Sequence, residues 1–222
     1  MGAVNSTIKT KISDLFSSLR GRKKASIVIL GLDNAGKSTL VNLLQGVTTP
    51  PIPTIGFNIE EIVFNNTTIT ICDIGGQSTF RNFWNKYVST MDGLVFMIDI
   101  CDKERFETSY HAFQKMFNEL KNGISVLLLL NKIDKLENAN EIKEARERIE
   151  KLYKVSTERS TANPVIIADD NGLNKEFKTK IYTLSVMDDI EKVKNDSSFS
   201  ISQSSVYQGF SWLIDNINKD KK

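Results

Sequence analysis

Eight residues near the start of the chain have the types and spacing of a phosphate-binding loop. Residues 31–38 read Gly-Leu-Asp-Asn-Ala-Gly-Lys-Ser, with an apolar run at 27–30 before them and a helix-like segment after them. Glycine at positions 31 and 36 permits backbone conformations that turn consecutive N–H groups toward a phosphate at a helix N-terminus. Kinases, ATPases and GTPases share this loop, so it predicts nucleotide binding without naming the base.

The side chains of the loop have separate tasks. The Lys37 ammonium would reach the β- and γ-phosphates, and the Ser38 hydroxyl would bind Mg²⁺. The residues of this loop that we expect to contact the nucleotide are Gly31, Asp33, Asn34, Ala35, Gly36, Lys37, Ser38 and Thr39.

A second motif, Asn131-Lys132-Ile133-Asp134, follows an apolar run at residues 126–130. The Asp134 carboxylate can accept hydrogen bonds from the N1–H and 2-amino groups of guanine, whereas adenine lacks this donor pair. Asn131 can brace the phosphate loop, and the stem of Lys132 can cover one face of the base. Four residues alone would also fit a turn at a strand end. About 95 residues after a phosphate loop, they predict guanine specificity.

Two further segments have the residues of loops that respond to a γ-phosphate. Residues 73–77 read Asp-Ile-Gly-Gly-Gln and follow an alternating strand. Asp73 can hold Mg²⁺ through water, the Gly76 N–H can reach a γ-phosphate, and the Gln77 amide can orient the attacking water without acting as a general base. In the loop at 53–58, Thr54 can supply a second hydroxyl ligand to Mg²⁺ once a γ-phosphate draws the loop in. We expect Lys37 and Gln77 to be the catalytic residues.

With these motifs the chain resembles the ADP-ribosylation-factor and Arf-like small GTPases of the Ras superfamily. The matching segments are GLDNAGKST at 31–39, PTIGFN at 53–58, DIGGQ at 73–77, FRNFWNKY at 80–87 and NKID at 131–134. Near the C-terminal part, Ser185 and Val186 occupy the place of the family's guanine-contacting Ser/Cys-Ala pair. The resemblance implies a switch that cycles between GDP and GTP with Mg²⁺, hydrolyses GTP slowly, and acts in vesicle or membrane trafficking.

The resemblance also implies partners: a guanine nucleotide exchange factor, a GTPase-activating protein and effectors, bound by a monomeric protein that contacts no nucleic acid. The phosphate loop contains no arginine that could neutralise charge in the transition state. By analogy with Ras, an arginine supplied by an activating protein would accelerate hydrolysis by about 10⁵. Cys72 stands where many Arf proteins have a tryptophan that belongs, with Phe57 and Tyr87, to an effector-binding aromatic group.

Three other readings remain open. A P-loop kinase of small metabolites would use the phosphate loop but has no role for Asp134 or Gln77. A GTP-bound scaffold module that never hydrolyses its nucleotide would keep every motif. The β subunit of the signal-recognition-particle receptor also has a long insertion before its last strand, but it has an N-terminal transmembrane span, and no apolar run here approaches the roughly 20 residues of such a span.

Residues 1–24 form an N-terminal arm with six basic side chains and one acidic side chain, in a chain of net charge +2. The arm begins Met-Gly-Ala-Val-Asn-Ser, which makes Gly2 a candidate for myristoylation. Five apolar residues recur on one face of a predicted amphipathic helix: Ile8, Ile12, Leu15, Phe16 and Leu19. One acyl chain binds a membrane only marginally, so the apolar face and the basic cluster would supply the second signal. We therefore expect a cytoplasmic protein that binds an endomembrane such as the Golgi reversibly and peripherally.

The rest of the chain, residues 25–222, is predicted to be one α/β domain. Near-continuous apolar runs at 93–99 and 125–130 indicate buried parallel strands, and helical spacings alternate with them. This order predicts the P-loop GTPase fold, a mainly parallel, doubly wound, six-stranded sheet with helices on both faces and nucleotide at the carboxyl ends of the strands. Cys72 and Cys101 are expected in core strands of a protein from a reducing compartment, and His111 on the surface.

Two polar stretches depart from the family pattern, near 156–180 and 188–204. Neither has enough apolar residues for a core of its own, so we expect both to be mobile or to bind partners rather than to form a second domain. Within the first stretch, residues 165–167 are apolar and are expected to form a short edge strand or a docking patch. A closing helix is predicted at 206–217.

Overall fold

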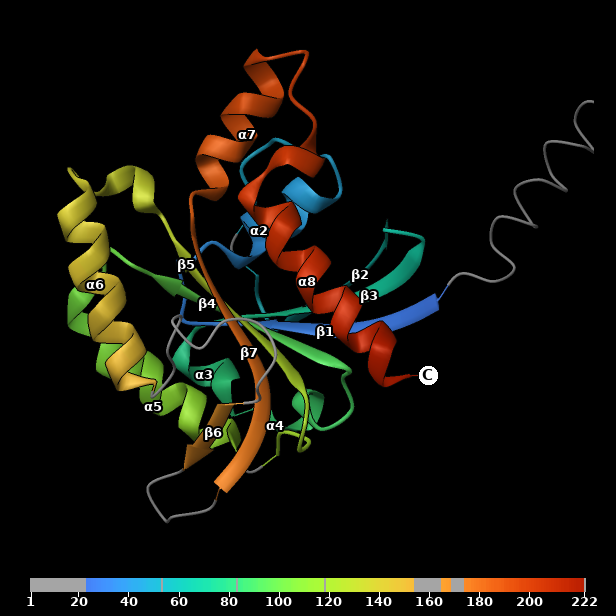
Figure 1. Ribbon diagram of the computed structural model, residues 1–222, viewed down its shortest axis with the longest axis vertical. Coiled ribbons are helices and arrows are strands. Elements are labelled where there is room, and N and C mark those ends of the chain that lie inside the picture. Colours follow the sequence, from blue (N-terminus) through green and yellow to red (C-terminus); the bar gives the residue numbers. More distant parts are fainter. Residues whose placement is uncertain are drawn as a thin grey trace, which may run out of the picture.

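The computed structural model of the protein describes residues 23–52, 54–82, 84–117, 119–153, 165–168 and 174–221. Figure 1 shows a twisted central sheet with helices packed on both of its faces. In the order of their positions in the sheet, the strands are β2 (Phe57–Phe64), β3 (Thr67–Ile74), β1 (Lys23–Leu30), β4 (Gly93–Asp99), β5 (Ser125–Asn131), β7 (Asn174–Leu184) and β6 (Val165–Ala168).

The five central strands are parallel, and the two edge strands β2 and β6 are antiparallel to their neighbours. Every residue of β5 is buried, and so are the first six of β4, because helices cover both faces of these strands. All five parallel strands end at the same edge of the sheet. That edge is where the motifs at 31–38, 73–77 and 131–134 begin, so the topology brings them together.

Helices cover the two faces of the sheet with separate apolar clusters. On one face pack α2 (Lys37–Leu44), α7 (Val186–Asn195) and α8 (Ser205–Asp220); on the other pack α4 (Trp84–Val88), α5 (Phe106–Phe117) and α6 (Ala139–Leu152). The four-residue helix α3 (Ser78–Arg81) follows the Gly-Gly-Gln segment, and three short 3₁₀ turns lie at Lys103–Arg105 (η1), Ile133–Lys135 (η2) and Ile201–Gln203 (η3).

The predicted fold class is confirmed, and β6 adds the short edge strand expected at residues 165–167. The closing helix predicted at 206–217 is α8 and extends by one residue at its start and three at its end. His111 is exposed and Cys72 is buried in β3, as predicted. Cys101 does not lie in a core strand: it is half-buried in the turn after β4.

The expectation that residues 188–204 are mobile is wrong, because most of this stretch is folded. The alternative, that the stretch binds partners, stays a prediction. Helix α7 extends to Asn195, and its apolar residues Val186 and Ile190, one turn apart, are buried against the same cluster as α2 and α8. The Ser185 hydroxyl caps this helix by accepting a hydrogen bond from the Asp188 N–H at 3.0 Å. The polar composition of the stretch therefore reflects the outer face of a helix and the turn after it.

Two other expectations fall outside the described residues. Most of the N-terminal arm predicted at 1–24, with Gly2 and the apolar face of its helix, lies among residues 1–22, whereas Lys23 and Lys24 begin β1. Most of the polar stretch near 156–180 lies in 154–164 and 169–173. Among the residues that the structure does describe, no helix is long and apolar enough to cross a membrane.

Candidate nucleotide-binding site

The phosphate loop joins the end of β1 to the start of α2, and two of its glycines are required by close contacts. Gly31 has φ +145°, and a Cβ atom there would lie 2.2 Å from the carbonyl oxygen of Met97. Gly36 has φ +99°, and a Cβ atom there would lie 2.5 Å from the Asn131 side-chain nitrogen. Both positions combine a left-handed backbone with a lack of space, so only glycine fits. Gly36 is the N-cap of α2 and has no side chain that could accept from the first N–H groups of the helix, so these groups remain available to an anion.

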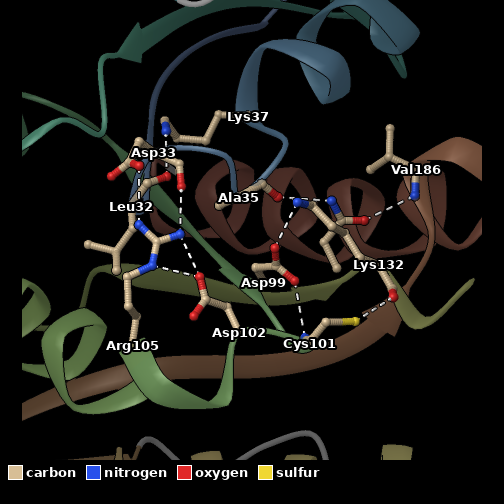
Figure 2. Close-up of polar contacts among 11 residues, drawn as sticks. Leu32, Asp33, Ala35, Lys37, Asp99, Cys101, Asp102, Arg105, Lys132 and Val186 are labelled. Carbon is tan, nitrogen blue, oxygen red and sulfur yellow. Dashed lines mark hydrogen bonds and ion pairs between the residues drawn. The ribbon is translucent and has the colours of Figure 1, made fainter. Parts of the chain in front are cut away.

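Lys37 is the first residue of α2 and is only 6% exposed. Its ammonium donates a hydrogen bond to the carbonyl of Leu32 at 3.0 Å, across the loop (Figure 2). Burial lowers the pKa of Lys37 to about 8, although the nearby carboxylates of Asp73 and Asp33 favour the charged form. A phosphate group beside this ammonium would compensate for the lost hydration, so the position suits an anion.

The hydroxyls of Ser38 and Thr54 and the carboxylate of Asp73 meet at one point. The Ser38 Oγ lies 2.7 Å from Asp73 Oδ2 and 2.8 Å from Thr54 Oγ1, and Thr54 Oγ1 lies 3.1 Å from the same carboxylate oxygen. Asp73 is 2% exposed, and its other oxygen, Oδ1, is buried without a hydrogen-bond partner among the described residues. Two hydroxyl oxygens gathered around a buried carboxylate that still has an unused acceptor form a donor set suited to Mg²⁺ and its bound water. The predicted metal residues therefore fit that ion.

Gly76 lies directly over the phosphate loop. A Cβ atom at this position would be 2.3 Å from the backbone nitrogen of Asp33, so any other residue would push the two segments apart. One residue earlier, the Gly75 N–H donates to the carbonyl of Gly56 at 2.9 Å and so connects the loop of Thr54 with the segment of Gly76. The exposed side chain of Gln77 lines, with Lys37 and Thr54 among others, a cavity of about 410 Å³.

Asn131, at the end of β5, is buried and joins two loops. Its side-chain nitrogen donates to the carbonyl of Ala35 at 2.9 Å, and its side-chain oxygen accepts from the N–H of Val186 at 3.1 Å. The sequence predicted the first of these contacts. The second shows that Ser185 and Val186, which begin the segment after β7, lie beside the Asn-Lys-Ile-Asp motif.

Lys132 and Asp134 are the two charged residues of that motif. The Lys132 ammonium is 2.7 Å from Asp99 Oδ2, and both side chains are largely buried. Asp134 lies in the 3₁₀ turn η2 and is exposed. A second cavity, of about 460 Å³, is lined by Asn34, Asp99, Lys132 and neighbouring residues. Asp134, Ser185 and Val186, the residues expected to contact the base, are not among the residues that line this cavity.

Sequence reasoning missed three residues of this region. Asp99 pairs with Lys132, and Arg81 and Arg105 both pair with Asp33, Arg81 at 3.4 Å and Arg105 at 3.1 Å. The signal for Asp99 was an acidic residue at the carboxyl end of a strand that is otherwise apolar. Arg81 and Arg105 are 48 and 72 residues from Asp33 in the sequence, so no local pattern indicated that they pair with it.

Comparison with known proteins decides the family. The family model of the ADP-ribosylation factors matches residues 12–183. The chain belongs to the ADP-ribosylation factor family. An ADP-ribosylation factor of Encephalitozoon cuniculi (strain GB-M1) is 38% identical over 135 residues, which are 60% of this chain and 64% of that relative. This family member therefore spans less than two thirds of that curated relative's length.

The fold of this ADP-ribosylation factor family member is also found in a solved structure. The Arl6 BBS3 small GTPase from Trypanosoma brucei, determined with the bound nucleotide analogue GppNp, superimposes with a TM-score of 0.62. The alignment covers 89% of this chain and 99% of that one, at 22% identity. At this level of identity the likeness concerns the fold alone.

Proposed function

We propose that this family member is a molecular switch that binds GDP and GTP with Mg²⁺ and hydrolyses GTP slowly. The observation that carries the proposal is the contact of Thr54 with Ser38 and Asp73. This contact joins three segments: the loop that precedes β2, the phosphate loop, and the end of β3. A γ-phosphate and its metal would lie where they meet. The γ-phosphate would hold the loop of Thr54 and the segment of Gly76, and its loss would release them.

Each step of the cycle has residues in this chain. The phosphate loop and Lys37 bind the phosphates, and Asp134 reads the guanine edge, beside Ser185 and Val186. Mg²⁺, held by Ser38, Thr54 and the water on Asp73, would neutralise charge on the β- and γ-phosphates. The Gly76 N–H faces the γ-phosphate and Gln77 orients the attacking water.

Hydrolysis is the part of the proposal that needs a direct test. We expect phosphate release from GTP over several turnovers to be slow with the protein alone and faster with an activating protein from a cell extract. Gln77→Leu keeps the size of the side chain but loses the amide, so stimulated hydrolysis should fall by about two orders of magnitude while GTP affinity changes little. Equal stimulated phosphate release from the parent and Gln77→Leu would remove Gln77 from the mechanism. A parent protein that releases no phosphate even with the extract would favour a GTP-bound scaffold over a switch.

The same switch would control a surface for effectors. Five large apolar residues in the loop of Thr54 and along β2 are exposed: Ile52, Ile55, Phe57, Ile59 and Val63. The ring centroids of Phe57, the first residue of β2, and Tyr87, in α4, lie 5.6 Å apart. This apolar surface supports effector binding in the GTP state. An exchange factor and an activating protein would act on the same switch, and the protein itself would be monomeric.

Membrane binding through the N-terminal arm is a further part of the proposal. Acylation of Gly2, the apolar face of the arm and its basic residues would together hold the protein on an endomembrane surface during a trafficking step. GTP should release the apolar face, so myristoylated protein should float with anionic liposomes more strongly with GTP than with GDP. Gly2→Ala should abolish most of the binding. Indistinguishable flotation in the two nucleotide states would show that the arm does not respond to the switch.

A further inference from the structure

Arg81 connects the Gly-Gly-Gln segment to the phosphate loop. It is the last residue of α3, and its Nε donates a hydrogen bond to the carbonyl of Gly76 at 2.9 Å. The Nη2 of the same guanidinium lies 3.4 Å from Asp33 Oδ1. One planar cation thus contacts both the residue that faces the γ-phosphate position and a side chain of the loop beneath it.

The carboxylate that accepts from Arg81 is also held by Arg105 (Figure 2). Arg105 in η1 lies 3.1 Å from Asp33 Oδ2, donates to the Asp33 carbonyl at 3.4 Å, and pairs with Asp102. Burial alone would raise the pKa of Asp33, but the hydrogen bonds and charge of Arg105, with the charge of Arg81, hold it below the ordinary value. The carboxylate is therefore a fixed, charged anchor for Arg81.

The bridge acts at the point where Gly76 approaches the phosphate loop most closely. The carbonyl of Gly76, which Arg81 binds, and the N–H of Gln77 belong to one planar peptide unit. A contact that fixes this carbonyl therefore also fixes the orientation of the Gln77 N–H. The N–H of Gly76 is on the same residue. An arginine that holds this carbonyl orients both groups that the proposed cycle assigns to the γ-phosphate and to the attacking water.

We infer that Arg81 is a positioning residue for the switch: it holds Gly76 and Gln77 over the phosphate loop without touching the nucleotide, and so favours GTP over GDP. The inference rests on the proposed function. GDP has no γ-phosphate for Gly76 to contact, so the bridge contributes to the affinity for GTP and to hydrolysis but not to the affinity for GDP. A purely structural ion pair on the surface would affect both nucleotides alike.

The test is the ratio of the affinities for GDP and for a non-hydrolysable GTP analogue, measured with Mg²⁺ on Arg81→Ala. We expect the affinity for the analogue to fall about tenfold, the loss typical of one charge-assisted hydrogen bond, and the GDP affinity to change less than about twofold. Single-turnover hydrolysis should fall by a similar factor. Lys115→Ala, which removes an exposed charge from α5, is the control for the change in net charge and should leave both affinities at the parental value.

Two further variants separate the bridge from a folding defect. Arg81→Lys keeps the charge, but a single ammonium cannot reproduce the two-sided geometry of the guanidinium, so it should recover little of the ratio. In Arg81→Ala with Asp33→Asn, the second substitution should add less than it does in the parent, because the two residues act through one contact.

The outcomes distinguish this inference from the proposed function. A parent protein that binds neither guanine nucleotide overturns both. A parent protein that binds and hydrolyses GTP, with an Arg81→Ala variant that weakens GDP and the analogue equally, or neither, overturns the role of Arg81 alone. Strictly additive effects of Arg81→Ala and Asp33→Asn on the affinity ratio would also contradict it.

Discussion

The side chain of Asn131 accepts a hydrogen bond from the N–H of Val186 at 3.1 Å, in the buried space between β5 and the start of α7. The same amide donates to Ala35 in the phosphate loop. One side chain at the end of a central strand therefore links the loop for the phosphates with the segment that we assign to the base.

The first prediction concerns this link. Asn131→Ala leaves the N–H of Val186 and the carbonyl of Ala35 buried without partners, each at a cost of about 1–3 kcal/mol. We expect the free energy of unfolding to fall by about 2–4 kcal/mol and the affinities for GDP and GTP to fall together. Chemical denaturation and nucleotide titration measure the two effects. Asn140→Ala, on the exposed face of α6, is the control and should stay within about 0.5 kcal/mol of the parent.

The second prediction concerns the base. Asp134→Asn exchanges an acceptor for a group that can also donate, so preference should move from guanine toward xanthine nucleotides by at least about 100-fold. Competition of GTP, ATP and xanthosine triphosphate for one labelled nucleotide measures it. Glu137→Gln removes the same charge from an exposed position nearby and should leave the preference unchanged. A parent protein that binds ATP as tightly as GTP would remove Asp134 from its assigned role.

The sequence was sufficient to place the three motifs at one edge of the sheet because each motif is local. The phosphate loop, the Gly-Gly-Gln segment and the Asn-Lys-Ile-Asp motif each follow an apolar strand, and parallel strands end at one edge of a sheet. Long-range pairs were not predictable in the same way. Arg105 and Asp33 are 72 residues apart and meet only because β4 lies next to β1. Helix α7 was missed because a mostly polar composition conceals the few apolar residues that it buries, such as Ile190.

A third prediction follows from the pKa of Lys37, which burial lowers to about 8. Phosphates favour the charged ammonium and so raise this pKa. A group whose pKa rises on binding takes up protons between its free and bound values, so GTP binding at pH 8.5 should be accompanied by proton uptake that is much smaller at pH 7. Calorimetric titration in two buffers of different ionisation enthalpy measures it. Lys37→Arg stays protonated throughout and should show no such uptake at pH 8.5.

A fourth prediction concerns Mg²⁺. Removal of the ion with a chelator should accelerate nucleotide release from the parent protein by at least about tenfold. Without the metal, the Asp73 carboxylate would repel the phosphates, and the hydroxyls of Ser38 and Thr54 would lose the ion that links them to the phosphates. Ser38→Asn should release GTP rapidly even with Mg²⁺ present and should favour the GDP or empty state. Stopped-flow fluorescence of a labelled nucleotide gives both rates. Nucleotide release that is insensitive to the chelator would contradict the assignment of the three oxygens.

The last prediction concerns the hairpin that joins the two switch loops. Its turn, Asn65-Asn66, has positive φ at both residues, and the Asn65 side chain accepts a hydrogen bond from the hydroxyl of Tyr207 in α8. Since this contact occurs together with the inward position of Thr54, we expect it to stabilise the arrangement that binds GTP. Tyr207→Phe keeps the ring against Phe64, 4.6 Å away, but loses the hydroxyl.

In Tyr207→Phe the affinity for a GTP analogue should fall by about threefold with little change for GDP, and amide exchange at the hairpin turn should accelerate. Hydrogen exchange followed by mass spectrometry on the analogue-bound protein measures the second effect. Ser211→Ala removes the weaker contact, 3.1 Å from the Asn65 amide, and should give a smaller change in the same direction. If exchange at the turn is the same in the parent and in Tyr207→Phe, then packing of Phe64 alone holds the hairpin, and α8 has no part in the choice between GDP and GTP.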